Sequence, residues 1–261
     1  MTANRDFAAQ TVVVTGGESG IGKACALALG AAGADVALTY FADSVAGEDV
    51  AQTIRGAGGK ALAVQADVGS ETAVEALFAA AERAFGRPVT LLVNSAGLNM
   101  KNIPIADMTL DRFDTVIRAD LYGPFLTCRR FVRGLGEGGR GRIVNISSIH
   151  ERAPRAGGAE YDSAKGGLSQ LTATLALELA PRGIAVNGVA PGMILTPMNQ
   201  SALDHPDELK AKEAAIPWGR AGRADEVAGL VSYLLSPAAD YITGTTVTID
   251  GALSLTVALG A

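Results

Sequence analysis

Short apolar runs alternate with longer helix-like stretches along most of this chain. The runs are rich in β-branched residues and almost continuously apolar, which is typical of parallel strands buried on both faces. We expect strands at 11–15, 35–39, 61–65, 90–94, 142–147, 184–189 and 246–249, and helices at 22–32, 44–56, 71–85, 110–133, 161–179 and 224–235. Alternation at this spacing builds βαβ units. The pattern therefore predicts an α/β fold with a seven-stranded, doubly wound parallel sheet.

No linker divides this alternation into two core-forming halves, so we expect a single domain over residues 1–261. The segment 196–223 is the longest polar stretch outside the pattern and carries several Asp, Glu and Lys residues. A connection of that length in a compact domain is typically functional. We predict a mobile helical lid there.

Composition excludes several classes of protein. The net charge is −5 and the 22 Lys and Arg residues are dispersed, so a nucleic-acid footprint is not expected. No stretch resembles a signal peptide or an uninterrupted apolar span, and Cys25 and Cys128 cannot build a disulfide framework. With two histidines and no carboxylate–histidine spacing, a metal site is not expected either. We predict a cytoplasmic protein without membrane contacts.

A glycine-rich turn, Thr15–Gly22, follows the first expected strand and opens the first helix. Glycines at Gly16, Gly20 and Gly22 let the backbone turn sharply, approach a pyrophosphate and pack the helix against the sheet. The helix N-terminus supplies N–H donors for phosphates. The turn predicts a dinucleotide site; a glycine-rich turn without a ligand is the alternative.

Further polar residues come at or just after the ends of later strands. Asn94–Gly97 closes the fourth strand, Ser148 closes the fifth, and Pro191-Gly192 follows the sixth. Tyr161 and Lys165 lie four residues apart, on one face of the expected helix. These positions cluster where an open α/β sheet binds its ligands.

Together these motifs resemble the short-chain dehydrogenase/reductase family, in its single-domain subtype, over essentially the whole chain. The stretches 143–151, 215–217 and 241–244, ahead of Asp250-Gly251, are most similar to the glucose 1-dehydrogenase-like members. The resemblance implies a Rossmann-type fold, a nicotinamide cofactor and a small-molecule substrate. It also implies a homotetramer that buries the apolar tail 251–261, which contains Leu253, Leu255, Val257 and Leu259.

Chemistry independently suggests roles for three of these residues. Hydride transfer at a carbinol carbon requires moving a proton to or from its oxygen, and a phenol of pKa near 10 is a poor base at neutral pH. A lysine nearby favours the ionised phenol. By resemblance, Tyr161 is the acid/base, Ser148 orients the substrate and Lys165 binds the nicotinamide ribose. His150 is either a substrate contact or a structural residue.

The candidate cofactor site combines the glycine turn with positions carried over from the family. Its members are Gly16, Glu18, Ser19, Gly20, Ile21, Gly22, Tyr40, Asp67, Val68, Asn94, Ala96, Gly97, Tyr161, Lys165, Pro191, Gly192, Ile194 and Thr196. Asp67 alternatively forms only an Asx turn. The second strand ends in Thr39–Ala42, without the carboxylate that would select NAD. No arginine selects NADP there, and Glu18 is unhelpful to a phosphate, so we expect NADP to be favoured slightly, with dual use open.

Asp120 completes the set of candidate catalytic residues, Ser148, Tyr161, Lys165 and Asp120. It stands where the family usually has an asparagine, and a carboxylate near Lys165 would offset part of the lysine charge at Tyr161. A more alkaline optimum for alcohol oxidation would follow. The alternative is that Asp120 points away and pairs with Arg118 or a neighbouring helix.

The sequence thus predicts an NAD(P)-dependent oxidoreductase acting on a secondary alcohol or carbonyl, with a sugar or polyol as substrate. One alternative is a ketone or 3-ketoacyl reductase. A cofactor-binding sensor with little catalysis is an alternative of another class.

Overall fold

The computed structural model describes residues 6–99, 101–197 and 205–258, and within these ranges seven strands form one parallel sheet. They are β1 (Thr11–Thr15), β2 (Asp35–Tyr40), β3 (Lys60–Gln65), β4 (Leu91–Asn94), β5 (Gly141–Ile146), β6 (Ile184–Pro191) and β9 (Thr246–Ile249). The spatial order is β3-β2-β1-β4-β5-β6-β9. The predicted doubly wound fold is confirmed, and the strand order reverses between β1 and β4, where such sheets bind ligands.

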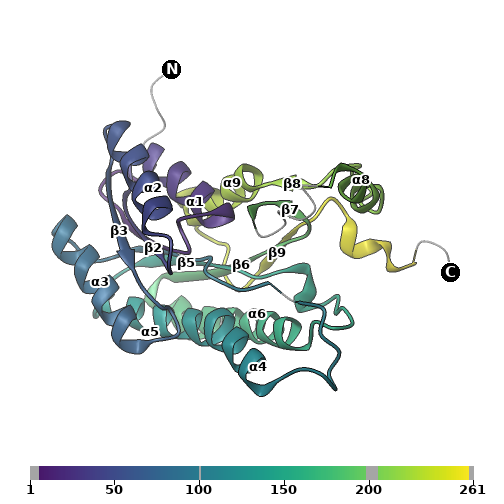
Figure 1. The fold of residues 1–261 in the computed structure, drawn as a ribbon. Helices are drawn as coiled ribbons and strands as arrows, with labels where there is room; N and C mark the ends of the chain where they lie inside the picture. The colour runs from purple at the N-terminus through teal and green to yellow at the C-terminus, as the bar shows by residue number, and fades with distance from the viewer. Residues whose placement is uncertain (1–5, 100, 198–204, 259–261) are drawn as a thin grey trace.

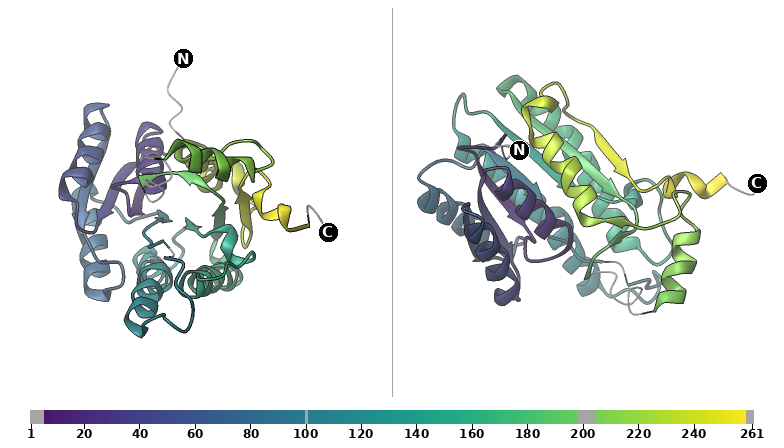
Figure 2. Two further views of the ribbon diagram at one scale, coloured as in Figure 1. Left: turned by 45° about the vertical axis from the view of Figure 1, so that its right-hand side comes forward. Right: turned by 90° about the horizontal axis from the view of Figure 1, so that it is seen from above.

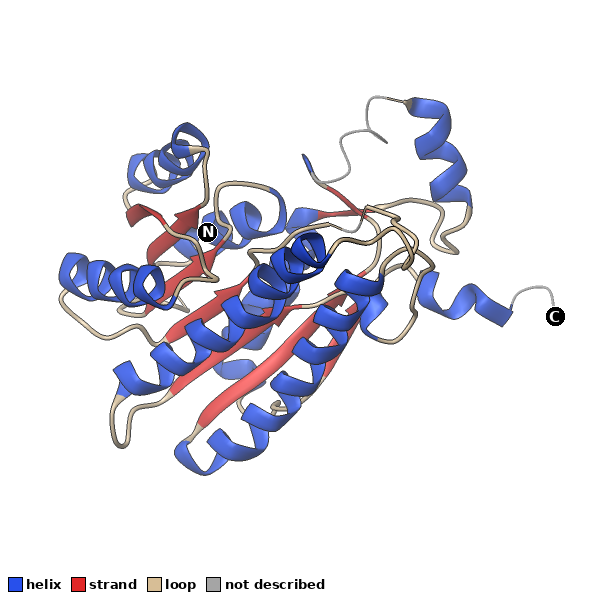
Figure 3. Cartoon of the chain, turned by 60° about the horizontal axis from the view of Figure 1, so that its bottom comes forward, coloured by secondary structure: helices blue, strands red, loops and turns tan. Residues whose placement is uncertain are grey.

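Helices cover both faces of this sheet (Figures 1 and 3). α1 (Gly20–Ala31), α2 (Ser44–Gly56) and α9 (Ala224–Leu235) lie on one face, and α3 (Glu71–Phe85), α5 (Gly123–Leu135) and α6 (Ala159–Leu179) on the other. Val12 and Val14 pack into the core of the first face and Val13 into that of the second. Side chains that alternate between two buried faces explain why the strands are almost continuously apolar.

The helix expected at 110–133 is interrupted, which corrects the sequence-based prediction. α4 (Leu110–Ile117) passes into a π-helical turn, η1 (Arg118–Tyr122), before α5 begins. Pro124 lacks the N–H that would bond the Asp120 carbonyl in a continuous α-helix, and Gly123 instead donates to the carbonyl of Arg118, five residues back. Such π turns are frequent at functional sites, and this one carries Asp120.

The polar segment after β6 begins and ends in a second, two-stranded sheet. β7 (Ile194–Leu195) pairs in parallel with β8 (Gly222–Arg223), and α8 (Pro206–Ala214) lies between them. The segment therefore contains a helix, as predicted; its mobility stays a prediction, and residues 198–204 lie outside the described part. Figure 2 shows α8 and the last turn, η6 (Leu253–Ala258), beyond one end of the sheet.

The connecting turns are short 3-10 helices, η2 (Ile149–Glu151), η3 (Ala180–Arg182) and η5 (Pro237–Ala239). Among the described helices, none combines the length and the apolar character needed to cross a membrane.

Candidate active site

A cavity of about 660 Å³ opens at the carboxyl ends of the central strands. Its walls come from the glycine turn after β1, the end of β2, the loop after β4, the end of β5, α6 and the segment after β6. The predicted residues that line it are Gly16, Glu18, Ser19, Gly20, Ile21, Gly22, Asp67, Val68, Ala96, Gly97, Asp120, Ser148, Tyr161, Lys165, Pro191, Gly192, Ile194 and Thr196. Tyr40, Asn94 and His150 are outside this lining.

The glycine turn is packed too tightly for side chains at two of its positions. A Cβ on Gly22 would lie 2.0 Å from the carbonyl oxygen of Gly16. Gly16 has φ +62°, and a Cβ there would lie 2.8 Å from the Cα of Ala96. The turn therefore requires glycine at both positions, and its backbone lines the cavity directly.

The N-terminus of α1 faces this turn with its N–H groups free of side-chain caps. Ser19 is the N-cap residue but makes no side-chain cap hydrogen bond, and the first turn of α1 carries no acidic residue. A helix start of this kind suits a phosphate. Glu18 adds a carboxylate to the wall; its Oε2 is buried and has no hydrogen-bond partner among the described residues.

The loop after β4 is held against β1 by a threonine. The Thr15 hydroxyl accepts hydrogen bonds from the N–H groups of Ser95 and Ala96, at 3.0 and 3.1 Å. Asn94 lies beneath this loop, where its amide donates to Asn145 at 2.8 Å and its carbonyl accepts from Thr127 at 2.7 Å. Asn94 therefore supports the loop from within the core and does not itself line the cavity.

The end of β2 departs from the sequence-based prediction in detail. Thr39 and Phe41 line the cavity, whereas a Cβ on Gly47 would lie 2.7 Å from the ring of Tyr40, which packs there. Asp43 is turned to its own helix, where its side chain accepts from the Ala46 N–H as the N-cap of α2. Strand alternation, which points Thr39 and Phe41 to the same side, is the signal that could have identified them.

Three of the four candidate catalytic residues, Ser148, Tyr161 and Lys165, line the same cavity. Ser148 is the second residue after β5, and its hydroxyl accepts from the His150 N–H at 3.2 Å. Tyr161 and Lys165 come from the first turns of α6, with the lysine Nζ 5.4 Å from the centre of the tyrosine ring. Lys165 Nζ also donates to the Ile146 carbonyl at 3.2 Å, so its ammonium is held between β5 and α6.

Asp120 faces this group and does not pair with Arg118. Its carboxylate is fully buried, with Oδ2 3.1 Å from Lys165 Nζ. Burial raises the pKa of Asp120 above its ordinary value, opposed by Lys165, the Leu98 N–H and Arg112. Burial alone would lower the pKa of Lys165, but the charges of Asp120 and Tyr161 outweigh it and the pKa of Lys165 is raised.

Two further candidates have structural contacts of their own. The ring centre of His150 lies 6.2 Å from that of Tyr161, edge-on, and its Nδ1 is 2.8 Å from the Ala153 carbonyl oxygen. Asp67 Oδ1 accepts from the Gly69 N–H at 2.9 Å, which is the Asx turn considered above, while the residue also lines the cavity. Thus the structural contact and the cavity position coexist at Asp67.

Leu98, Thr115 and Arg118 line the cavity, although the sequence did not predict a place in the site for any of them; Arg118 was considered only as a partner of Asp120. Thr115 comes from α4 and Arg118 from the π turn. The sequence predicted one continuous helix over 110–133, and that helix gave no indication that these two residues face the cavity. Leu98 follows Gly97 directly and could have been found from its place in the loop after β4.

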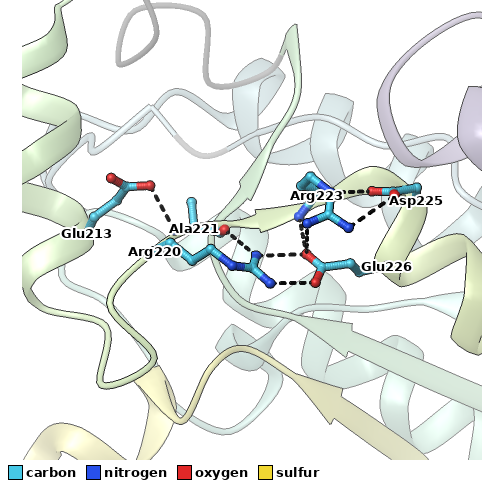
Figure 4. A network of polar contacts seen from close by, with 6 residues as sticks. All are labelled: Glu213, Arg220, Ala221, Arg223, Asp225 and Glu226. Atoms are coloured by element: carbon cyan, nitrogen blue, oxygen red, sulfur yellow. Dashed lines mark hydrogen bonds and ion pairs between the residues drawn. The ribbon is translucent and has the colours of Figure 1, made fainter.

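The border of the cavity near Thr196 and Pro197 leads into the segment that β7 and β8 close. A network of charged groups fixes the far end of this segment (Figure 4). Arg220 binds Glu226 through two hydrogen bonds, and this contact lowers the pKa of Glu226 to about 2. Glu213 accepts from the Ala221 N–H at 3.0 Å, which ties the end of α8 to the same network.

Within the described residues, no group of three or more His, Cys, Asp or Glu side chains could hold a metal ion.

The chain as a whole is similar to known enzymes in sequence and in fold. A family model described as enoyl-(acyl carrier protein) reductase matches residues 16–254. The chain is 41% identical over 251 residues to 3beta-hydroxysteroid dehydrogenase 1 of Eggerthella lenta, covering 96% of this chain and 95% of the relative. It is 34% identical to glucose 1-dehydrogenase 2 of Bacillus subtilis, covering 96% and 97%. A crystal structure of a putative gluconate dehydrogenase from Agrobacterium tumefaciens superimposes with a TM-score of 0.89 at 33% identity, covering 97% of this chain and 99% of the other.

Proposed function

The chain belongs to the short-chain dehydrogenase/reductase family and is an NAD(P)-dependent oxidoreductase acting on CH–OH groups, and we propose that its substrate is the secondary alcohol of a sugar or polyol. The observation that supports the site assignment is the convergence of Ser148, Tyr161 and Lys165 on one cavity with the glycine turn. The relatives named glucose 1-dehydrogenase and putative gluconate dehydrogenase support the sugar class.

In the proposed mechanism, Tyr161 moves the proton and Ser148 positions the oxygen. In oxidation, the Tyr161 phenolate takes the proton of the substrate hydroxyl while the Ser148 hydroxyl holds that oxygen by a hydrogen bond. Lys165, buried and positively charged 5.4 Å from the ring centre, favours the phenolate. A bound nicotinamide cofactor would supply the hydride acceptor for the carbinol carbon.

The residues present fit a dinucleotide. The uncapped start of α1 and the backbone of the glycine turn would hold the pyrophosphate, because Gly22 leaves no side chain between the turn and the helix. The loop after β4 would line the adenosine ribose, and Asp67 would meet the adenine. Lys165 would bind the nicotinamide ribose, and Ile194 and Thr196 would face the carboxamide.

We expect NADP to be used at least as well as NAD. Asp43, the first carboxylate after β2, caps α2 and leaves Thr39 and Phe41 at the cavity wall, so no carboxylate of this strand end repels a 2′-phosphate. The measurement is kcat/KM with each cofactor at saturating substrate. A preference for NAD of more than about 100-fold, about 2.7 kcal/mol, would contradict this interpretation of the strand end.

We propose a homotetramer in solution. Leu110, Phe125 and Leu177 are exposed on α4, α5 and α6, and Leu255 in η6 is 76% exposed. An isolated chain would leave these apolar side chains in water, and contacts between subunits would bury them. Light scattering at micromolar concentration should give four times the mass of the chain; a monomer there would refute the assignment. Leu259, also expected in this contact, lies outside the described residues.

A substrate panel tests the proposed function. Sugars, polyols, simple ketones, a 3-ketoacyl thioester and a 3β-hydroxysteroid, each with NAD and NADP, separate the sugar class from the ketone or 3-ketoacyl reductase alternative. Calorimetric binding of each cofactor runs alongside. Cofactor binding without turnover of any substrate would favour the alternative of a cofactor-binding sensor with little catalysis.

The cytoplasmic location stays a proposal, supported by the free thiols of Cys25 and Cys128.

A further inference from the structure

The Asp120 carboxylate connects the two halves of the candidate site, one oxygen to each. Oδ1 accepts a hydrogen bond from the Leu98 N–H at 2.7 Å, in the loop after β4. Oδ2 lies 3.1 Å from Lys165 Nζ on α6. The loop packs so closely on the carboxylate that a Cβ on Gly97 would come within 2.7 Å of Oδ2. Asp120 is thus enclosed by the loop after β4 and by Lys165, the two parts of the site that it contacts.

The charges around Asp120 alternate in sign. Lys165 faces it from α6, with Tyr161 on the other side of the lysine contact, 5.4 Å from ring centre to Nζ, and Arg112 acts on it from α4. Arg112 Nη2 lies 3.4 Å from Oε1 of Glu160, a fully buried residue next to Tyr161 in the chain. Arg112 also donates to the Asn99 carbonyl at 2.5 Å. The loop after β4 is therefore bound by Asp120 at Leu98 and by Arg112 at Asn99. Buried charges so arranged interact more strongly than exposed ones, because water screens them less.

We propose that Asp120 is a positioning residue that offsets the charge Lys165 presents to Tyr161, and so moves alcohol oxidation to higher pH. This proposal rests on the proposed function. An uncharged asparagine could make the same hydrogen bond to Leu98 through its carbonyl oxygen, but it would bring no charge to Lys165. The specific contribution of the carboxylate is therefore electrostatic.

The direction of the effect follows from the sign of the charges. Oxidation needs Tyr161 as the phenolate, which a lone ammonium favours and an ammonium neutralised by Asp120 favours less. Carbonyl reduction needs Tyr161 protonated, so Asp120 extends the pH range over which the enzyme reduces efficiently. The geometry thus points to a site better suited, at neutral pH, to the reductive direction than an asparagine-bearing site would be.

The first test is the pH profile of kcat/KM for alcohol oxidation in Asp120→Asn. We expect the midpoint of the rising limb to fall by about one pH unit, the lower end of the effect of a nearby charge. Oxidation at neutral pH should then rise by up to about tenfold, because each pH unit is a factor of ten in phenolate concentration. An unchanged midpoint would overturn the proposal.

Two companion variants separate charge from scaffolding. Asp120→Ala loses the acceptor for Leu98 and should raise the KM for cofactor, whereas Asp120→Asn should keep it near the parent value. Glu75→Gln removes one carboxylate from an exposed ion pair with Arg130 on the helices far from the cavity and should leave the pH profile unchanged. If Asp120→Asn raises the cofactor KM as much as Asp120→Ala and leaves the midpoint in place, the carboxylate is only structural.

A spectroscopic titration tests the same point without turnover. The ultraviolet absorbance of ionised tyrosine, taken as the difference between the parent and Tyr161→Phe, follows Tyr161 alone. We expect its midpoint to fall when Asp120→Asn is introduced into both proteins. If Asp120→Asn does not fold, the parent protein still provides a test. A midpoint of Tyr161 ionisation below about pH 7, far under the ordinary phenol value of about 10, would mean that Asp120 does not offset the charge of Lys165, and it would overturn the proposal. If no alcohol is oxidised, the proposed function fails while this titration still decides the role of Asp120.

Discussion

Tyr161→Phe should lose at least about 99% of turnover and still bind the cofactor. The phenol hydroxyl is the group that exchanges a proton with the substrate oxygen, and a positioned acid/base contributes about 10²–10⁴-fold to rate. Phenylalanine keeps the ring at the cavity wall beside Lys165 and removes only that hydroxyl. The measurements are kcat at saturating substrate and cofactor affinity by calorimetry.

Tyr241→Phe is the matched control, because Tyr241 is fully exposed and does not line the cavity. It should turn over substrate at the parent rate. If Tyr161→Phe also keeps near-normal turnover, the assignment of Tyr161 as the acid/base is wrong, and the proton must be carried by another group.

Gly22→Ala should weaken cofactor binding by about ten- to hundredfold. The added methyl would lie 2.0 Å from the Gly16 carbonyl oxygen and 2.7 Å from its carbon, so the backbone of the glycine turn must move. Overpacking of this kind costs about 1–3 kcal/mol, and here the displaced backbone is the cavity wall itself. Calorimetric titration with NAD and with NADP measures the loss.

Gly229→Ala is the matched control, a second helical glycine, exposed in α9, with open space around its position. This change should leave cofactor affinity unaltered and stabilise the protein by about 0.5–1 kcal/mol, because alanine loses less backbone entropy in a helix. Equal affinity losses in the two variants would show that the turn after β1 is not the phosphate site.

The main features of the fold could be predicted locally, because each strand and helix carries its own period. α2, α3 and α9 have the bounds that their hydrophobic pattern predicted, as do β1 and β9. Apolar side chains that must be buried on both faces of a strand leave a pattern in the sequence whatever their partners are. The π turn at 118–122 leaves no such pattern, since it depends on one missing donor at Pro124.

The candidate site was predictable wherever a motif lies at the end of a strand. The glycine turn, Ser148, Tyr161 and Lys165 all meet at one cavity, because the carboxyl ends of parallel strands share one edge of the sheet. Resemblance to a family then added roles that spacing alone does not carry. Tyr40 and Asn94 also stand at strand ends, where their side chains pack against Gly47 and Asn145 outside the cavity lining, and their part in cofactor binding stays a prediction.

Asp120 marks the division between sequence and tertiary structure most clearly. Its identity as a carboxylate, and hence its charge, can be read from the chain alone. Whether it pairs with Arg118 beside it or with Lys165, 45 positions further along, depended on how α4, η1 and α6 pack. Long-range pairing of buried charges follows from the packing of elements distant in sequence, because only burial among them excludes the water that would otherwise screen each charge.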